Sequence, residues 1–236
     1  MNLEEYSVIK SRHKVFERDS VKFIRKEIRL NVLGIERCEI MRDLMLGYVS
    51  RIREVGIPMP KIEESHVKNG MIYFICKYRG KNLVELFEER EASDIFENHL
   101  ETFKQAIGAI RNAKESDLCL DPHIKNFVID ENGLSYVDFS PPYSKGYNAL
   151  VLSRTRVSDK EIVEKNLNAF MPDQLGYHFM GDLLKEDKKY SNISPEIYRI
   201  LLREKLIKGG FDEFISMANK IKDIEIERVE RDIYLI

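Results

Sequence analysis

The stretch CLDPHIKNFVIDENGLSYVDFSPP, residues 119–142, is the part of the sequence that decides the fold. Its apolar runs flank Glu131-Asn132-Gly133, residues that a tight turn favours, so the stretch predicts a β-hairpin preceded by an irregular segment. Asp121 and Asn126 stand on that segment, and Asp138 ends the second strand. Because a hairpin brings its two ends together, we expect Asn126 and Asp138 to lie within a few ångströms of each other.

These three polar residues suit phosphoryl transfer. A carboxylate and an amide oxygen at short distance fit a hard cation such as Mg²⁺, which takes oxygen ligands and completes its shell with water and phosphate oxygens. Asp121, just upstream, is placed to accept a proton from a hydroxyl nucleophile. The alternative is that all three are structural, because Asp and Asn are also the commonest residues of turns.

Upstream of this stretch the pattern predicts strands around one helix. Apolar and polar residues alternate from His13 to Ile28 on either side of Arg18-Asp19-Ser20, which indicates a hairpin. The segments KIEESHV and MIYFICKY indicate a second hairpin around Lys68-Asn69-Gly70. Between them a helix is expected from about Ile35 to Arg53, ended by the prolines of Gly56–Pro60. The apolar stripe of that helix is Met41, Leu44, Met45, Tyr48 and Ile52.

After Gly80 the pattern is helical to near the end of the chain, interrupted by the 119–142 hairpin. Ser194-Pro195 predicts a helix start with Ser194 as the cap, and Gly209-Gly210 predicts a helix stop. The fold class we expect is α+β. A small β-rich part with one long helix would occupy residues 1–79, a connector residues 77–82, and a mostly helical part residues 80–236.

Composition excludes several classes of protein. The formal net charge is -2, with charges of both signs throughout, so we expect no nucleic-acid partner and no membrane partner. The first fourteen residues contain no apolar core flanked by basic residues and a small-residue cleavage site, so they predict no signal peptide. No apolar run approaches the roughly 18 residues of a membrane span. Cys38, Cys76 and Cys119 form no CxxC pair, and the expected location is the reducing cytoplasm.

The pattern D-x-H-x-x-N from Asp121 to Asn126, followed by a strand pair and Asp138-Phe139, resembles the protein-kinase-like superfamily, specifically its aminoglycoside phosphotransferase and choline kinase branch. The resemblance extends over roughly residues 8–142. It implies a two-lobed fold and transfer of the γ-phosphate of ATP to a hydroxyl of a small molecule. By the same resemblance Asp121 is the catalytic base, and Asn126 and Asp138 are the Mg²⁺ ligands.

The resemblance also implies a nucleotide site. Lys22 is our choice for the phosphate-binding lysine, with Lys26 as the rival that strand periodicity cannot separate from it. Backbone groups of Lys77 and Arg79, in the connector CKYRG, would hydrogen-bond adenine. The glutamate that holds the lysine would be Glu36 or Glu39, yet both lie opposite the apolar stripe of the helix, and neither is assigned.

Three features depart from the family pattern. Cys119 stands where His or Tyr is usual, and Ser140 stands where glycine usually follows Asp-Phe. No glycine-rich loop precedes the first hairpin. Two alternatives therefore stay open beside the small-molecule kinase: a small atypical protein kinase, or a kinase-fold binding protein without catalysis. The acidic residues after position 143 are candidates for binding a cationic acceptor, although such charges more often lie on the wet face of a helix.

Overall fold

The computed structural model describes residues 9–30, 35–88, 91–142, 157–186 and 188–230, and the fold is a mixed α+β arrangement. An antiparallel four-stranded sheet has the order β1-β2-β4-β3. Its members are β1 (Ile9–Arg18), β2 (Val21–Leu30), β3 (Ile62–Lys68) and β4 (Met71–Lys77), with α1 (Ile35–Glu54) between β2 and β3 in the chain. Both predicted hairpins and the predicted helix are thereby confirmed.

The turns of these hairpins follow from their residues. Asp19 and Ser20 have φ of 53° and 60°, and Asn69 and Gly70 have φ of 52° and 70°. Two successive residues with positive φ match the right-handed twist of the flanking strands, and Asp, Asn and Gly tolerate that conformation. The register pairs His13 with Lys26 across β1 and β2, a pairing that matters for the site.

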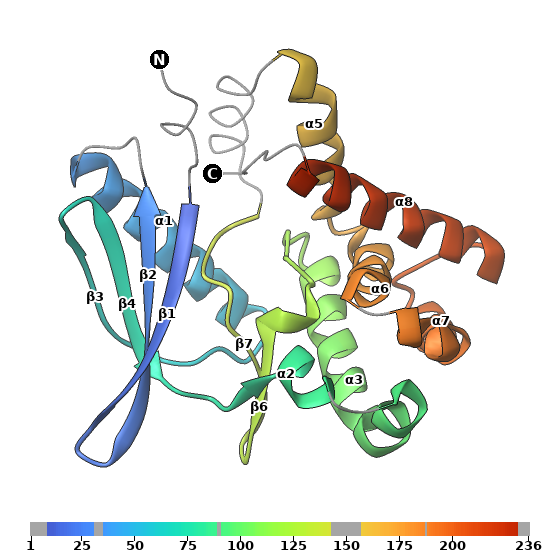
Figure 1. Ribbon diagram of the computed structural model, residues 1–236, viewed down its shortest axis with the longest axis horizontal. Helices are drawn as coiled ribbons and strands as arrows, with labels where there is room; N and C mark the ends of the chain where they lie inside the picture. The colour runs from blue at the N-terminus through green and yellow to red at the C-terminus, as the bar shows by residue number, and fades with distance from the viewer. Residues whose placement is uncertain (1–8, 31–34, 89–90, 143–156, 187, 231–236) are drawn as a thin grey trace.

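The remaining elements form a second, three-stranded sheet and a set of helices. β5 (Lys81–Asn82), β6 (Phe127–Asp130) and β7 (Gly133–Tyr136) pair in that order, which confirms the 119–142 hairpin. The helices are α2 (Leu83–Phe87), α3 (Ala92–Glu115), α5 (Lys160–Ala169), α6 (Leu175–Glu186), α7 (Ser194–Arg203) and α8 (Phe211–Glu230). The four-stranded sheet and α1 lie on one side of the molecule, the helices on the other, with β6 and β7 between them (Figure 1).

Two details of the helix ends differ from expectation. Ser194 does not cap α7, because its hydroxyl donates to the carbonyl of Tyr190, one turn earlier. Gly209-Gly210 does not end α7, which stops at Arg203 and is followed by Lys205 with φ of 57°. The glycines instead stand directly before α8, so the chain turns there into the next helix.

Buried apolar side chains form two clusters, and α1 contributes to both. The first, between α1 and the four-stranded sheet, contains Ile28, Cys38, Met41, Met45, Val49, Ile72, Phe74, Cys76 and Phe139. The second, among the helices and the second sheet, includes Tyr48 and Ile52 from α1. Leu44, expected in the apolar stripe, is instead 50% exposed. Cys38 and Val49, outside that stripe, are buried instead, so the face that α1 buries is rotated about the helix axis relative to the predicted one.

The segment that follows β7 crosses from one cluster to the other. Tyr136 is buried in the second cluster, and Phe139 in the first, where its ring packs edge-on against Phe74 at 5.4 Å. Asp138 lies between these two anchors, so packing on both sides fixes its backbone.

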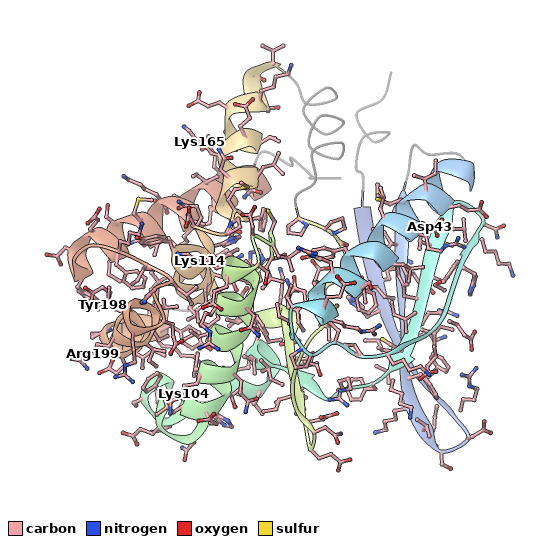
Figure 2. The ribbon with its side chains drawn as sticks, turned by 180° about the vertical axis from the view of Figure 1, so that it is seen from behind. Asp43, Lys104, Lys114, Lys165, Tyr198 and Arg199 are labelled. Atoms are coloured by element: carbon pink, nitrogen blue, oxygen red, sulfur yellow. The ribbon has the colours of Figure 1, made fainter. Side chains whose placement is uncertain are left out.

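Seen from behind, Asp43 marks α1, and Lys104 and Lys114 mark the second half of α3, with Lys165 and Tyr198 on the helices beyond (Figure 2).

None of the described helices combines the length and apolar character that crossing a bilayer requires.

Candidate functional site

The carboxylate of Asp138 is paired with the ammonium group of Lys26. Lys26 Nζ lies 3.0 Å from Asp138 Oδ1, although the residues are 112 positions apart, and the two side chains are 11% and 14% exposed. Lys22, the lysine chosen from the sequence, is exposed at the start of β2. Of the two rivals, Lys26 is the one that the structure brings to Asp138. Alternation alone did not separate them, because both lie on the same face of β2, and the position along the strand relative to Asp138 decides.

A small cavity opens beside this ion pair. It is lined by Ile24, Lys26, Pro60, Cys76, Lys77, Tyr78, Arg79, Gly80, Val128, Val137 and Phe139, with His13 at its edge. Most of the lining residues are apolar, and most come from β2 and β4, from β6, from the segment after β7 and from the connector between β4 and β5. An apolar slot with a few charged groups at one end is a common form of small-molecule site.

Lys77 and Arg79, the connector residues proposed from the sequence, both line this cavity, but the contacts of one residue differ from those of the other. Tyr78 N–H donates to the carbonyl of Lys22 at 3.0 Å, so the ladder between β2 and β4 continues to that residue. Because bonding alternates along an antiparallel pair, the backbone groups of Lys77 face away from β2. The side chain of Arg79 turns to Asp130, with Nε 3.1 Å from Oδ2, and so ties the connector to β6.

The loop that carries Asp121 is held by the buried side chains on either side of it. Leu120 and Ile124 are fully buried, which leaves Asp121 and His123 between two anchors. The amide group of Asn126 donates to the carbonyl of Asp121 at 3.3 Å. Val137 N–H donates to the carbonyl of Asn126 at 2.8 Å. This bond places Asn126 beside the residue that precedes Asp138, as the hairpin predicted.

Two tyrosines tether the backbone at the position where Cys119 departs from the family pattern. The hydroxyl of Tyr48 donates to the carbonyl of Cys119 at 3.1 Å, and Asp121 N–H donates to the hydroxyl of Tyr136 at 3.3 Å. Burial raises the pKa of both tyrosines well above the ordinary value and raises the pKa of the Cys119 thiol to about 11. These side chains are neutral at pH 7, and the tyrosines take over the tethering that Cys119 cannot provide.

His123 links Asp121 to a buried ionic cluster. Its Nδ1 contacts Asp121 Oδ1, which also accepts from His123 N–H at 3.2 Å. Its Nε2 lies 2.8 Å from Glu225 Oε1 on α8. His178 on α6 places its Nε2 2.7 Å from the same carboxylate oxygen. Asp182 on α6 accepts from Ile124 N–H at 2.8 Å.

Mutual attraction sets the ionisation of the cluster. Burial alone would raise the pKa of Asp121 and lower that of His123, but their attraction reverses both effects. The pKa of Asp121 falls well below its ordinary range, and the pKa of His123 is raised to about 10. Burial likewise opposes the ionised form of Glu225, yet hydrogen bonds from His123 and His178 bring its pKa below the ordinary value.

Lys185 completes the cluster. Its Nζ lies 2.9 Å from Asp182 Oδ1 and 3.0 Å from Glu225 Oε2. Burial would lower the pKa of this ammonium group, but the two carboxylates raise it. Among the described residues, Asp121, His123 and His178, and also His123, Asp182 and Glu225, have donors close enough to share a metal ion. Because Lys185 and the protonated ring of His123 already supply positive charge there, we assign no metal to this cluster.

Asp121, Asn126 and Asp138 are the site residues predicted from the sequence, and the structure places their backbone segments next to one another. Glu39 is exposed on α1, and the side chain of Glu36 lies outside the described part. The members of the ionic cluster on the later helices were missed. A signal existed, since His178, Asp182 and Lys185 follow one another at helical spacing on α6 and form a polar stripe on a largely buried helix.

Sequence comparison finds no match among the models of known protein families and none among curated proteins.

Proposed function

We propose that the chain is an ATP- and Mg²⁺-dependent phosphotransferase that moves the γ-phosphate to a hydroxyl of a small molecule. The observation that carries this proposal is the ion pair of Lys26 and Asp138 at the charged end of an apolar cavity, next to the loop of Asp121. A flat apolar ring fits such walls, and an ammonium group beside a carboxylate fits phosphates with a cation. The resemblance of the Asp121–Asn126 pattern points to the same chemistry.

The proposal includes the finer architecture. Residues 1–79 would form the nucleotide-binding lobe and residues 80–236 the lobe that carries the base and the acceptor, in a protein-kinase-like arrangement within the cytoplasm. Adenine would lie against Ile24 and Val128, near the backbone of Lys77. The cavity measures ≈ 70 Å³, whereas ligand pockets typically measure roughly 300–1,000 Å³, so entry of a nucleotide requires side chains such as Lys26 to move.

The residues of the chain would share the chemistry as follows. Lys26 releases Asp138 and holds phosphate oxygens by charge-assisted hydrogen bonds. The acceptor hydroxyl oxygen forms a new bond to the γ-phosphorus, the bond from that phosphorus to the β–γ bridging oxygen breaks, and ADP leaves. The hydroxyl proton passes to Asp121. Since His123 uses Oδ1 of Asp121, Oδ2 is the oxygen left for this proton.

Asn126 and Asp138 are the residues that would hold Mg²⁺, because both offer the oxygen ligands that this ion prefers. Asp138 already faces a cation in the form of Lys26. With its amide nitrogen donating to Asp121, Asn126 keeps its amide oxygen for an ion. When bound, the ion neutralises the charge of the phosphates during transfer.

Transfer is tested by incubating the protein with γ-labelled ATP, Mg²⁺ and a panel of amino sugars, amino alcohols and sugars, and by following label in the small-molecule fraction. We expect labelled product with the natural chain and a loss of about 10²–10⁴-fold in rate for Asp121→Asn. Asp43→Asn, on α1 at a side chain 62% exposed, is the matched control and keeps the natural rate. Equal rates for Asp121→Asn and the natural chain would overturn the assignment of Asp121.

The same experiment separates the alternatives. Label on added protein, with none on the small molecules, would favour an atypical protein kinase. Nucleotide binding with no label on any acceptor would favour a binding protein without catalysis.

A further inference from the structure

Asp121 belongs to a cluster of six ionisable side chains, most of them buried, and the phosphoryl-transfer step proposed above uses Asp121 alone. His178 and Asp182 are fully buried and Glu225 is 1% exposed. Burying charges is costly unless every charge is paired, and apolar side chains of the same volume are often no less stable. Stability alone therefore does not explain this cluster, which points to a role in the proposed reaction.

Each carboxylate of the cluster faces a cationic or hydrogen-bonding side chain. Its carboxylates are Asp121, Asp182 and Glu225. Facing them are the Lys185 ammonium, the protonated ring of His123, and His178, whose two ring nitrogens both face acceptors. His178 Nδ1 lies 3.0 Å from the carbonyl of Ala169 and Nε2 lies 2.7 Å from Glu225. A carbonyl and a carboxylate can only accept hydrogen bonds, so both neighbours of this ring are acceptors.

The cluster has a direction, from the buried helices to the surface of the site. Lys185 and His178 hold Glu225, Glu225 holds Nε2 of His123, and Nδ1 of His123 contacts Asp121. Exposure rises along this chain, from 2% at the Glu225 side chain to 7% at His123 and 19% at Asp121. Asp121 is the member on the side of the proposed site, whereas Lys185, at the other end of the chain of contacts, is 24% exposed.

Close packing of α6 and α8 puts Glu225 in place. A Cβ atom on Gly181 would lie 2.7 Å from the carbonyl oxygen of Ala218, so the two helices touch at a position that only glycine fits. Glu225 lies two turns beyond Ala218 on α8. At this helix separation its carboxylate reaches past α6 to the loop of Asp121.

We propose that Glu225, held by His178 and Lys185, is a positioning residue that locks the His123 ring and through it the carboxylate of Asp121. The inference rests on the proposed phosphotransferase function and deepens it, since it assigns the last described helix to the reaction. Its physical basis is orientation. A carboxylate whose one oxygen is fixed by an imidazolium presents its other oxygen in one direction, and misplacement by about 1 Å is enough to slow a reaction by about 10²-fold.

The first test is kinetic and uses the full chain, Mg²⁺-ATP and water as the acceptor, with ADP release as the readout. Glu225→Gln keeps the shape of the side chain and removes its charge. We expect kcat to fall by about 10–100-fold, the range seen when groups that orient metal ligands are removed. KM for Mg²⁺-ATP should stay within about twofold, because the cavity beside Lys26 is untouched.

A compensated variant separates positioning from folding. Glu225→Gln combined with Lys185→Gln removes one charge of each sign, so its Tm should recover toward that of the natural chain. Under the proposal its kcat stays as low as that of Glu225→Gln. Recovery of kcat together with Tm would mean a structural role only and would overturn the inference. Glu204→Gln, which breaks the 2.7 Å ion pair of Glu204 with Arg111 away from the cluster, is the matched control and keeps kcat.

A second readout needs no catalysis. In ¹⁵N-imidazole spectra the ring protons of His123 exchange slowly with water in the natural chain, and we expect Glu225→Gln to speed that exchange at least tenfold. Unchanged exchange would overturn the inference even in an active enzyme. Absence of ADP release from the natural chain, with the exchange effect present, would instead overturn the proposed function and leave the positioning contact standing.

Discussion

Gly80→Ala is the glycine substitution that we expect to distort the proposed nucleotide site most. Gly80 stands at the end of the connector with φ of +91°, and a Cβ there would lie 2.1 Å from the carbonyl oxygen of Ile129 on β6. Gly80→Ala therefore has to push β5 away from β6. Because Gly80 and Val128 both line the cavity, the same movement would distort the cavity wall.

The magnitude follows from two contributions. A non-glycine residue in the left-handed region costs about 1–2 kcal/mol. Separating β5 from β6 disturbs the two residue pairs Lys81↔Ile129 and Asn82↔Val128, whose hydrogen bonds contribute about 1 kcal/mol each. The expected loss of unfolding free energy is about 3–4 kcal/mol, which for a chain of this length lowers Tm by about 6–16 °C.

Gly70→Ala is the matched control for this experiment. Gly70 has φ of +70°, but nothing lies within 4 Å of a Cβ built there, so only the conformational cost of about 1–2 kcal/mol applies. Both variants are compared by calorimetry and by urea unfolding. Equal losses for the two variants would refute the reasoning, since they would show that the connector does not approach Ile129 as closely as described.

Further outcomes are expected at the charged end of the site. Lys26→Met should weaken Mg²⁺-ATP binding by about 10–100-fold in a calorimetric titration, the equivalent of about 1.5–3 kcal/mol for a charged hydrogen bond, whereas Lys22→Met should leave Kd unchanged. Asp121→Asn should lower turnover by about 10²–10⁴-fold and keep that Kd, and weakened binding would contradict its role as base. Because the pKa of His123 is raised to about 10 from 6.5, the stability that the protonated ring contributes is complete below about pH 6.5 and is lost as pH rises toward 10. Tm measured from pH 6 to 10 should fall more steeply for the natural chain than for His123→Gln, and parallel curves would contradict the pairing.

Local chemistry made much of this fold predictable from the sequence. Turn residues that tolerate positive φ, such as Asp19-Ser20 and Asn69-Gly70, made both early hairpins predictable. An apolar stripe at helical spacing made α1 predictable. The neighbourhood of Asn126 and Asp138 was equally readable, since a hairpin of known turn position brings named residues together. These features depend on contacts close in sequence.

Features that depend on tertiary packing were not predictable in this way. Lys22 and Lys26 share one strand, and what separates them is the position of Asp138, 112 residues from Lys26. Leu44 has the spacing of a core residue but faces outward, because the buried face of α1 is centred nearer to Cys38 and Val49. The pairing of Glu225 with His123 depends on how closely α6 and α8 pack, which no local pattern encodes.

The most direct test of the central claim is a calorimetric titration of the full chain with ATP, with and without Mg²⁺, repeated on Asp138→Asn. The account predicts saturable binding that requires Mg²⁺ in the natural chain and is lost in the variant. Because a ligand at a hundred times its Kd stabilises by about 2.7 kcal/mol, a matching rise in Tm is expected under the same conditions. Binding that is absent in the natural chain, or equal in Asp138→Asn, would contradict the claim that this cavity is a Mg²⁺-nucleotide site.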